Sequence, residues 1–189
     1  MHRLFVAIRP PDPVIDLLLD TMAGLPSLRW QNDEQLHLTL RFVGEVERPL
    51  AEDLAVALGA LRFAPFEIRI AGVGRFDHHK RGALWAGVEP RRPLAALAAK
   101  IERICVSIGL APEHRAYHPH VTLARWGRAC PERSRGGADT SLDAFLSAHA
   151  ALRSDDFTVD TVTLHESHLG RDGAHYEAVA IYRADHRIR

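Results

Sequence analysis

The chain repeats one order of predicted elements at an offset of 80 residues. Leu4–Pro10 (LFVAIRP) and Leu84–Pro90 (LWAGVEP) are short apolar runs closed by proline, which is typical of buried strands. Apolar residues at helical spacing follow each run. We therefore expect strand, helix, strand, helix, strand twice, over approximately 3–75 and 83–166, with a closing strand at 175–183. A chance alternation of helices and strands is the alternative interpretation.

Two such repeats predict an α+β fold in a single bilobal domain. Each lobe would hold antiparallel sheet and helices, and a pseudo-twofold axis would relate the lobes across a central cleft. The expected helices cover 12–25, 50–61, 94–108 and 142–151. The expected strands cover 3–8, 36–43, 66–73, 83–88, 121–124, 157–166 and 176–183.

Composition limits the class of protein. The 189 residues are 47% hydrophobic, which suffices for a buried core. The formal charge is zero, from 24 basic and 24 acidic residues, which excludes a globally basic nucleic-acid binder but allows a local basic patch. The chain has no membrane-length apolar run and no signal-peptide core. Cys105 and Cys130 are too few for a disulfide framework and lack metal-site spacing, so we expect a cytoplasmic protein. We also expect a monomer that does not contact a membrane.

Both halves contain the same tetrad on a predicted strand, HLTL at 37–40 and HVTL at 120–123, which start 83 residues apart. Alternate side chains of a strand share a face, so His37 and Thr39 point one way while the apolar pair points to the core. The same holds for His120 and Thr122. Under a pseudo-twofold, both His-Thr pairs would face one cavity.

That arrangement suits phosphodiester hydrolysis. One neutral imidazole can take a proton from water, and one imidazolium can give a proton to the leaving oxygen. Threonine hydroxyls can donate to the nonbridging phosphate oxygens. A zinc site at His118-Pro119-His120 is an alternative, but zinc usually needs three or four ligands and no H-E-x-x-H or cysteine pair occurs.

These motifs resemble the two-histidine phosphoesterase superfamily, and more closely its RNA 2′,3′-cyclic phosphodiesterase (2′-5′ RNA ligase) family. The resemblance implies metal-independent hydrolysis of an RNA 2′,3′-cyclic phosphate end to a 2′-phosphate, without a cofactor. RNA ends, such as those of tRNA fragments, would be the partners. The strings that carry the resemblance are RLFVAIRP near the start, HLTLRFVGEV (37–46), HPHVTLAR (118–125) and LHESHLG (164–170).

The resemblance also implies roles for individual residues. His37 would be the general acid toward the 3′-oxygen, and His120 would be the base that activates water. Thr39 and Thr122 would bind phosphate oxygens, and Arg125 matches a basic position that the family uses at the phosphate. Because Arg125 lies five residues after His120, an ideal strand would point it away, so the strand must end, twist or bulge there.

Candidate substrate contacts are less tightly tied to the motifs. Core packing is the favoured interpretation for Phe42 and Trp85, and Arg41 shares the parity of His37. Segment 124–141 is rich in Arg and Gly. This composition equally indicates a loop that contacts RNA phosphates or a solvated surface loop. The residues considered for base stacking or phosphate contact are Phe42, Trp126, Arg128 and Tyr176.

Two other functions stay open from the sequence. One is a phosphodiesterase for small cyclic or 2′-5′-linked nucleotides. The other is an RNA-binding module without catalysis, although a binding role would not need both imidazoles. Ligation through a 2′-5′ bond is the formal reverse of hydrolysis.

Overall fold

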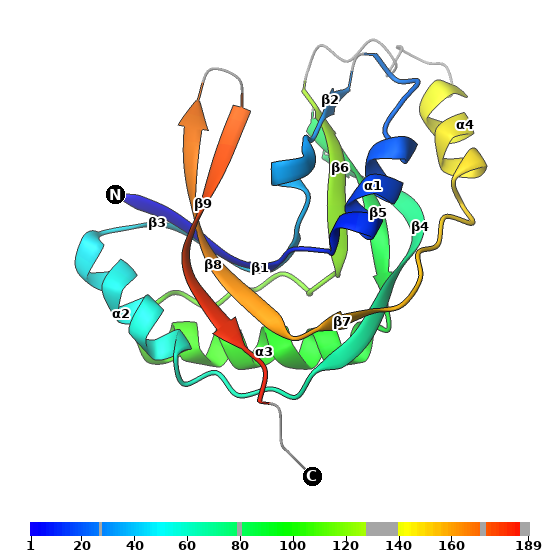
Figure 1. Cartoon of the computed structure of the whole chain (residues 1–189). Coiled ribbons are helices and arrows are strands. Elements are labelled where there is room, and N and C mark those ends of the chain that lie inside the picture. The colour runs from blue at the N-terminus through cyan, green and yellow to red at the C-terminus, as the bar shows by residue number, and fades with distance from the viewer. Residues whose placement is uncertain (27, 79–80, 128–139, 171–172, 186–189) are drawn as a thin grey trace.

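The computed structural model describes residues 1–26, 28–78, 81–127, 140–170 and 173–185 (Figure 1). The helices are α1 (Asp12–Thr21), α2 (Arg48–Leu58), α3 (Arg91–Ser107), α4 (Thr140–Ala148) and the 3₁₀ turn η1 (Asp33–Gln35). The strands are β1 (His2–Ile8), β2 (Arg29–Trp30), β3 (Leu38–Val46), β4 (Phe66–His78), β5 (Arg81–Glu89), β6 (His120–Trp126), β7 (Phe157–Val159), β8 (Thr161–Gly170) and β9 (Gly173–Arg183).

One curled antiparallel sheet organises the molecule, with strand order β7-β4-β5-β6-β3-β1-β8-β9 and β2 paired to β6. The α+β class is thereby confirmed. Helix α3 packs on β3, and α2 packs on α3, β1 and β9. Apolar side chains between sheet and helices form the core, which includes Leu4, Val6 and Ile8 of β1. Within the described residues, no helix has the length and apolar character that a membrane span requires.

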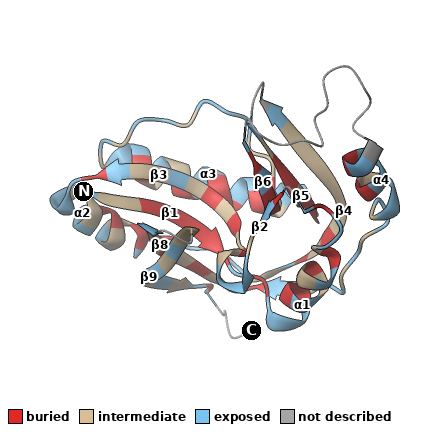
Figure 2. Ribbon diagram, turned by 90° about the horizontal axis from the view of Figure 1, so that it is seen from above, coloured by how far each residue is buried: buried red, intermediate tan, exposed pale blue. Residues whose placement is uncertain are grey.

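The two halves of the sequence exchange strands. β4 ends the first predicted repeat but pairs with β5 of the second, and β8 ends the second predicted repeat but pairs with β1 of the first. The sheet therefore has one group of β1, β3, β8 and β9 and another of β2, β4, β5 and β6, which Figure 2 shows at opposite ends of the molecule. The seam between the groups is the contact of β3 with β6.

Each motif strand carries one extra residue at the same place in its tetrad. Along β3 the pairing with β1 skips Leu40, and along β6 the pairing with β5 skips Leu123. A bulge of this kind reverses the side-chain alternation beyond it, because the period of a strand is two residues. Phe42 and Arg125 therefore lie on the same face as the preceding histidines.

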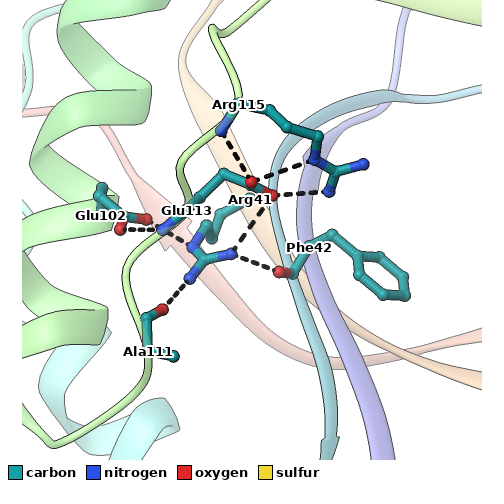
Figure 3. Close-up of polar contacts among 6 residues, drawn as sticks. All are labelled: Arg41, Phe42, Glu102, Ala111, Glu113 and Arg115. Carbon is teal, nitrogen blue, oxygen red and sulfur yellow. Dashed lines mark hydrogen bonds and ion pairs between the residues drawn. The ribbon is translucent and has the colours of Figure 1, made fainter.

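The bulge also turns Arg41 to the opposite face, toward α3, so the parity expected from an ideal strand is wrong for this residue. Its Nε lies 2.5 Å from Oε2 of Glu102, and its Nη2 donates to the carbonyl oxygen of Ala111 at 2.6 Å (Figure 3). Oε2 of Glu113 lies 3.9 Å from Nη1 of Arg41. The pKa of Glu113 is lowered to about 2 by hydrogen bonds from Arg115 and by the charge of Arg41. Arg41 therefore joins β3 to α3 and to the segment that follows it.

Replacing Arg41 with methionine is expected to lower the free energy of unfolding by about 2 kcal/mol, because Glu102 would lose its half-buried cation. Urea denaturation measures this change. The matched control is Arg48→Met, which removes an exposed pair with Glu52 and should cost less than about 0.5 kcal/mol. Equal losses in the two variants would show that the Arg41 contacts contribute no more than a surface pair.

Candidate active site

The seam between β3 and β6 brings the two tetrads together. Leu38 pairs with Val121 in antiparallel register, and both side chains are buried in the core. Extending this register by one residue each way sets His37 opposite Thr122 and Thr39 opposite His120. All four side chains then lie on the face away from the core. The structure thus brings together the four residues that the sequence singled out.

Both imidazoles are held in the same way. Nδ1 of His37 lies 2.7 Å from the carbonyl oxygen of Gln35, and Nδ1 of His120 lies 2.7 Å from that of His118. A carbonyl oxygen only accepts, so Nδ1 carries the proton in each ring. In the neutral form each Nε2 is then unprotonated, and it can accept a proton or return one.

Aromatic side chains pack around each catalytic candidate. The ring of His37 lies 4.8 Å from Phe5 and 5.1 Å from Tyr176, and that of His120 lies 5.0 Å from Phe76. Trp85, the repeat counterpart of Phe5, lies 6.2 Å from His120. Such contacts fix the orientation of both rings and remove water from around them.

This burial has an electrostatic consequence. The pKa of His37 falls from 6.5 to about 4, chiefly through this burial; the hydrogen bond to Gln35 opposes the shift, and the charges of His165, Arg125 and His120 contribute to it. Burial also lowers the pKa of His120, and the charges of His118 and Arg125 act in the same direction. Both rings are therefore neutral near pH 7 when the site holds no anion. An anion between them would favour protonation of either ring.

Acid is expected to destabilise the protein through His37. Because its pKa is about 4 in the folded state and 6.5 in the reference state, the unfolded chain binds this proton first as the pH falls. The contribution of His37 to stability is present above pH 6.5, declines as the pH drops toward 4, and amounts to about 2 kcal/mol lost by about pH 5. Urea unfolding at two pH values measures it, and His37→Asn should reduce the loss. An equal loss in the variant would assign the acid sensitivity to other groups.

Arg125 lies on the face of β6 that the bulge at Leu123 predicts. It is exposed, it shares the face of His120 and Thr122, and its charge acts on both histidines. A guanidinium in this position can neutralise an anion held between the two imidazoles.

The other four candidate contacts differ in their surroundings. Phe42 is 41% exposed, with Arg3 Cζ 5.3 Å from its ring centroid, so the expectation of core packing is wrong for it. Tyr176 packs edge-on against His37. Trp126 is 5% exposed and packs over Gly82, so it offers no ring face to a base, which corrects its selection as a substrate contact. Arg128 lies outside the described residues.

Sequence reasoning missed a third imidazole near the site. His165 of β8 pairs with Phe5 of β1, and their rings stack at 5.1 Å with an angle of 14°. Phe5 in turn contacts His37, and the charge of His165 acts on that ring. The alternation of β8 could predict the face on which His165 lies, but only the pairing with β1 shows that it meets Phe5.

In the described part of the chain, no three His, Cys, Asp or Glu side chains are grouped so that they could hold a metal ion. His118, which the zinc alternative needs, packs its ring at 4.8 Å against Trp85.

Comparison with known proteins gives matches over most of the chain. A Methanothermobacter thermautotrophicus protein named RNA 2′,3′-cyclic phosphodiesterase is 30% identical over 188 residues, which cover 96% of this chain and 98% of that protein. An Aeropyrum pernix protein of the same name is 40% identical over 112 residues, which cover 57% of this chain and 63% of that protein. The chain thus spans less than two thirds of the Aeropyrum relative's length.

The fold also matches solved structures. The Escherichia coli LigT structure complexed with 3′-AMP aligns with a TM-score of 0.76 at 23% identity, over 97% of this chain and 98% of that one. At this identity the likeness concerns the fold. The sequence match shows the family, because residues 10–171 fit the 2′-5′ RNA ligase superfamily. This match covers both tetrads and most of the chain, which therefore belongs to the 2′-5′ RNA ligase superfamily.

Proposed function

We propose that the protein hydrolyses 2′,3′-cyclic phosphate ends of RNA to 2′-phosphates without a metal ion. The observation that carries the proposal is the seam of β3 and β6, where two imidazoles and two threonines share one face and both Nε2 atoms are available for proton transfer. Family membership and relatives named RNA 2′,3′-cyclic phosphodiesterase support it.

In the proposed reaction, water attacks phosphorus and the bond from phosphorus to the 3′-oxygen breaks. His120 Nε2 takes the proton from water, and His37 Nε2–H gives a proton to the departing oxygen. His37 becomes the imidazolium only when the anionic phosphate is bound, since its pKa is about 4 without one. Thr39 and Thr122 donate to the nonbridging oxygens, and Arg125 balances their charge.

The test is hydrolysis of 2′,3′-cyclic nucleotides and of an RNA with a cyclic phosphate end, in EDTA. We expect full activity and a 2′-phosphate product. Loss of activity in EDTA would contradict the metal-independent mechanism, and a 3′-phosphate product would reverse the acid and base assignment. Binding without turnover would identify a non-catalytic RNA-binding module, and turnover of small 2′-5′-linked nucleotides alone would identify the narrower phosphodiesterase.

We further propose that a monomer carries out this reaction in the cytoplasm, on RNA ends such as those of tRNA fragments. A monomer suffices for the proposed reaction because each chain contains both histidines. Sedimentation during turnover tests this proposal.

A further inference from the structure

Arg29 and Arg125 form a cross-strand pair on the short ladder between β2 and β6. Their neighbours in the ladder, Trp30 and Ala124, belong to the core side, where Trp30 lies 5.9 Å from Phe145. Side chains alternate along a strand, so Arg29 and Arg125 both lie on the opposite side, which is the face of His120 and Thr122. Directly opposed residues of an antiparallel pair have Cβ atoms about 5 Å apart.

This pair is electrostatically unfavourable by itself, because like charges directly opposite each other destabilise a sheet. Other arginines of the sheet are compensated: Arg69 lies 3.0 Å from Glu89 and 3.1 Å from Asp156, and Arg75 contacts two carboxylates in the same way. Within the described residues, neither member of the pair forms an ion pair with a carboxylate. Two opposed and uncompensated guanidinium groups favour an anionic ligand.

The position of the pair relates it to the site. The charges of Arg125, Arg3 and Arg29 all act on Tyr176, which packs against His37. The charge of Arg125 acts on both histidines, whereas that of Arg29 is not among the influences on either one. Arg29 is therefore near the site, but it lies on the neighbouring strand β2, whereas Arg125 shares β6 with His120 and Thr122.

Charge balance indicates what Arg29 binds. A cyclic phosphodiester carries one negative charge, and Arg125 and the protonated His37 already place two positive charges beside it. The charge of Arg29 is then left for a second phosphate, and in RNA the nearest one is the phosphodiester that joins the terminal nucleotide to the one before it.

We propose that Arg29 binds this preceding phosphodiester, so that the protein selects RNA ends of two or more nucleotides over cyclic mononucleotides. The inference rests on the proposed hydrolysis of 2′,3′-cyclic phosphate ends. It assigns the direction in which the RNA leaves the cleft, along β2 and β6 (Figure 1).

The test compares three substrates: uridine 2′,3′-cyclic phosphate, the dinucleotide UpU ending in the same cyclic phosphate, and that dinucleotide with an uncharged methylphosphonate linkage. For the unmodified protein we expect kcat/KM to be about tenfold higher for the charged dinucleotide than for the other two. In Arg29→Gln this ratio should fall to about one. In Arg103→Gln, which removes an exposed arginine of α3, the ratio should stay at about ten.

Two outcomes would overturn the inference. One is a dinucleotide preference that Arg29→Gln retains, and the other is a methylphosphonate dinucleotide that reacts as well as the charged one. If no substrate is hydrolysed, the proposed function fails, and calorimetric affinities of the three ligands for the His120→Asn variant still decide the subsite. Equal affinities for the charged and uncharged dinucleotides in that measurement would overturn it as well.

Discussion

Replacing either His37 or His120 with asparagine is expected to lower kcat for cyclic phosphate hydrolysis by at least about 100-fold. Asparagine keeps an N–H group that can donate to the carbonyl of Gln35 or His118, so the strand ends stay in place. It lacks the Nε2 atom, and with it the group that moves the proton. Single-turnover kinetics with uridine 2′,3′-cyclic phosphate separates this loss from changes in binding.

The matched control is His114→Asn, because His114 is an exposed histidine in the segment before β6. Its kcat should stay within about twofold of the unmodified protein. The double variant should be little worse than either single one, since residues that act as a unit are not additive. A rate near that of the control for His37→Asn or His120→Asn would remove that histidine from the mechanism.

The imidazoles of His37 and His120 should together give a bell-shaped dependence of kcat on pH. Its two apparent pKa values belong to the coupled histidines together and not to either one. Bound phosphate should place the upper value above the pKa of His37 in the empty site, which is about 4. A flat profile between about pH 5 and pH 8 would contradict two titrating imidazoles.

The tetrads could be found from the sequence, and the repeat could be hypothesised, because both depend on local rules. Alternation along a strand determines which residues accompany His37, and proline closes each first strand. The α+β class followed from these patterns, the superfamily followed from the resemblance of the motif strings, and both are confirmed.

Local rules could not provide the register of the strands, that is, which residues of two neighbouring strands lie opposite each other. A single extra residue, Leu40 or Leu123, reverses the face of the residues that directly follow it, so Arg41 turns away from the face of His37 while Phe42 and Arg125 lie on the face of the histidines. Pairing between distant strands likewise decides which rings lie at His37, since Phe5 of β1 and Tyr176 of β9 contact it and His165 of β8 stacks on Phe5. The matching bulges support the proposed internal duplication, because they repeat at the same place in both tetrads.

Replacing Arg125 with methionine is expected to lower kcat by about 10²- to 10³-fold, the effect of removing one group that stabilises developing charge. Methionine keeps most of the length of the side chain and removes the charge. Arg125→Lys should recover part of the rate, because lysine restores the charge without the paired N–H groups. Arg103→Met on α3 is the control for removing one exposed arginine, and stopped-flow measurement of kcat for all three variants makes the comparison.

The pH profile of Arg125→Met distinguishes an electrostatic role from a structural one. In the native site the charge of Arg125 lowers the pKa of both His37 and His120. Without that charge both imidazoles hold a proton more tightly, so the catalytic base becomes available only at higher pH. The acidic limb of kcat/KM should therefore move toward higher pH in Arg125→Met and return toward its original position in Arg125→Lys. A lower rate with an unmoved acidic limb would mean that Arg125 shapes the strand without acting on the histidines or the phosphate between them.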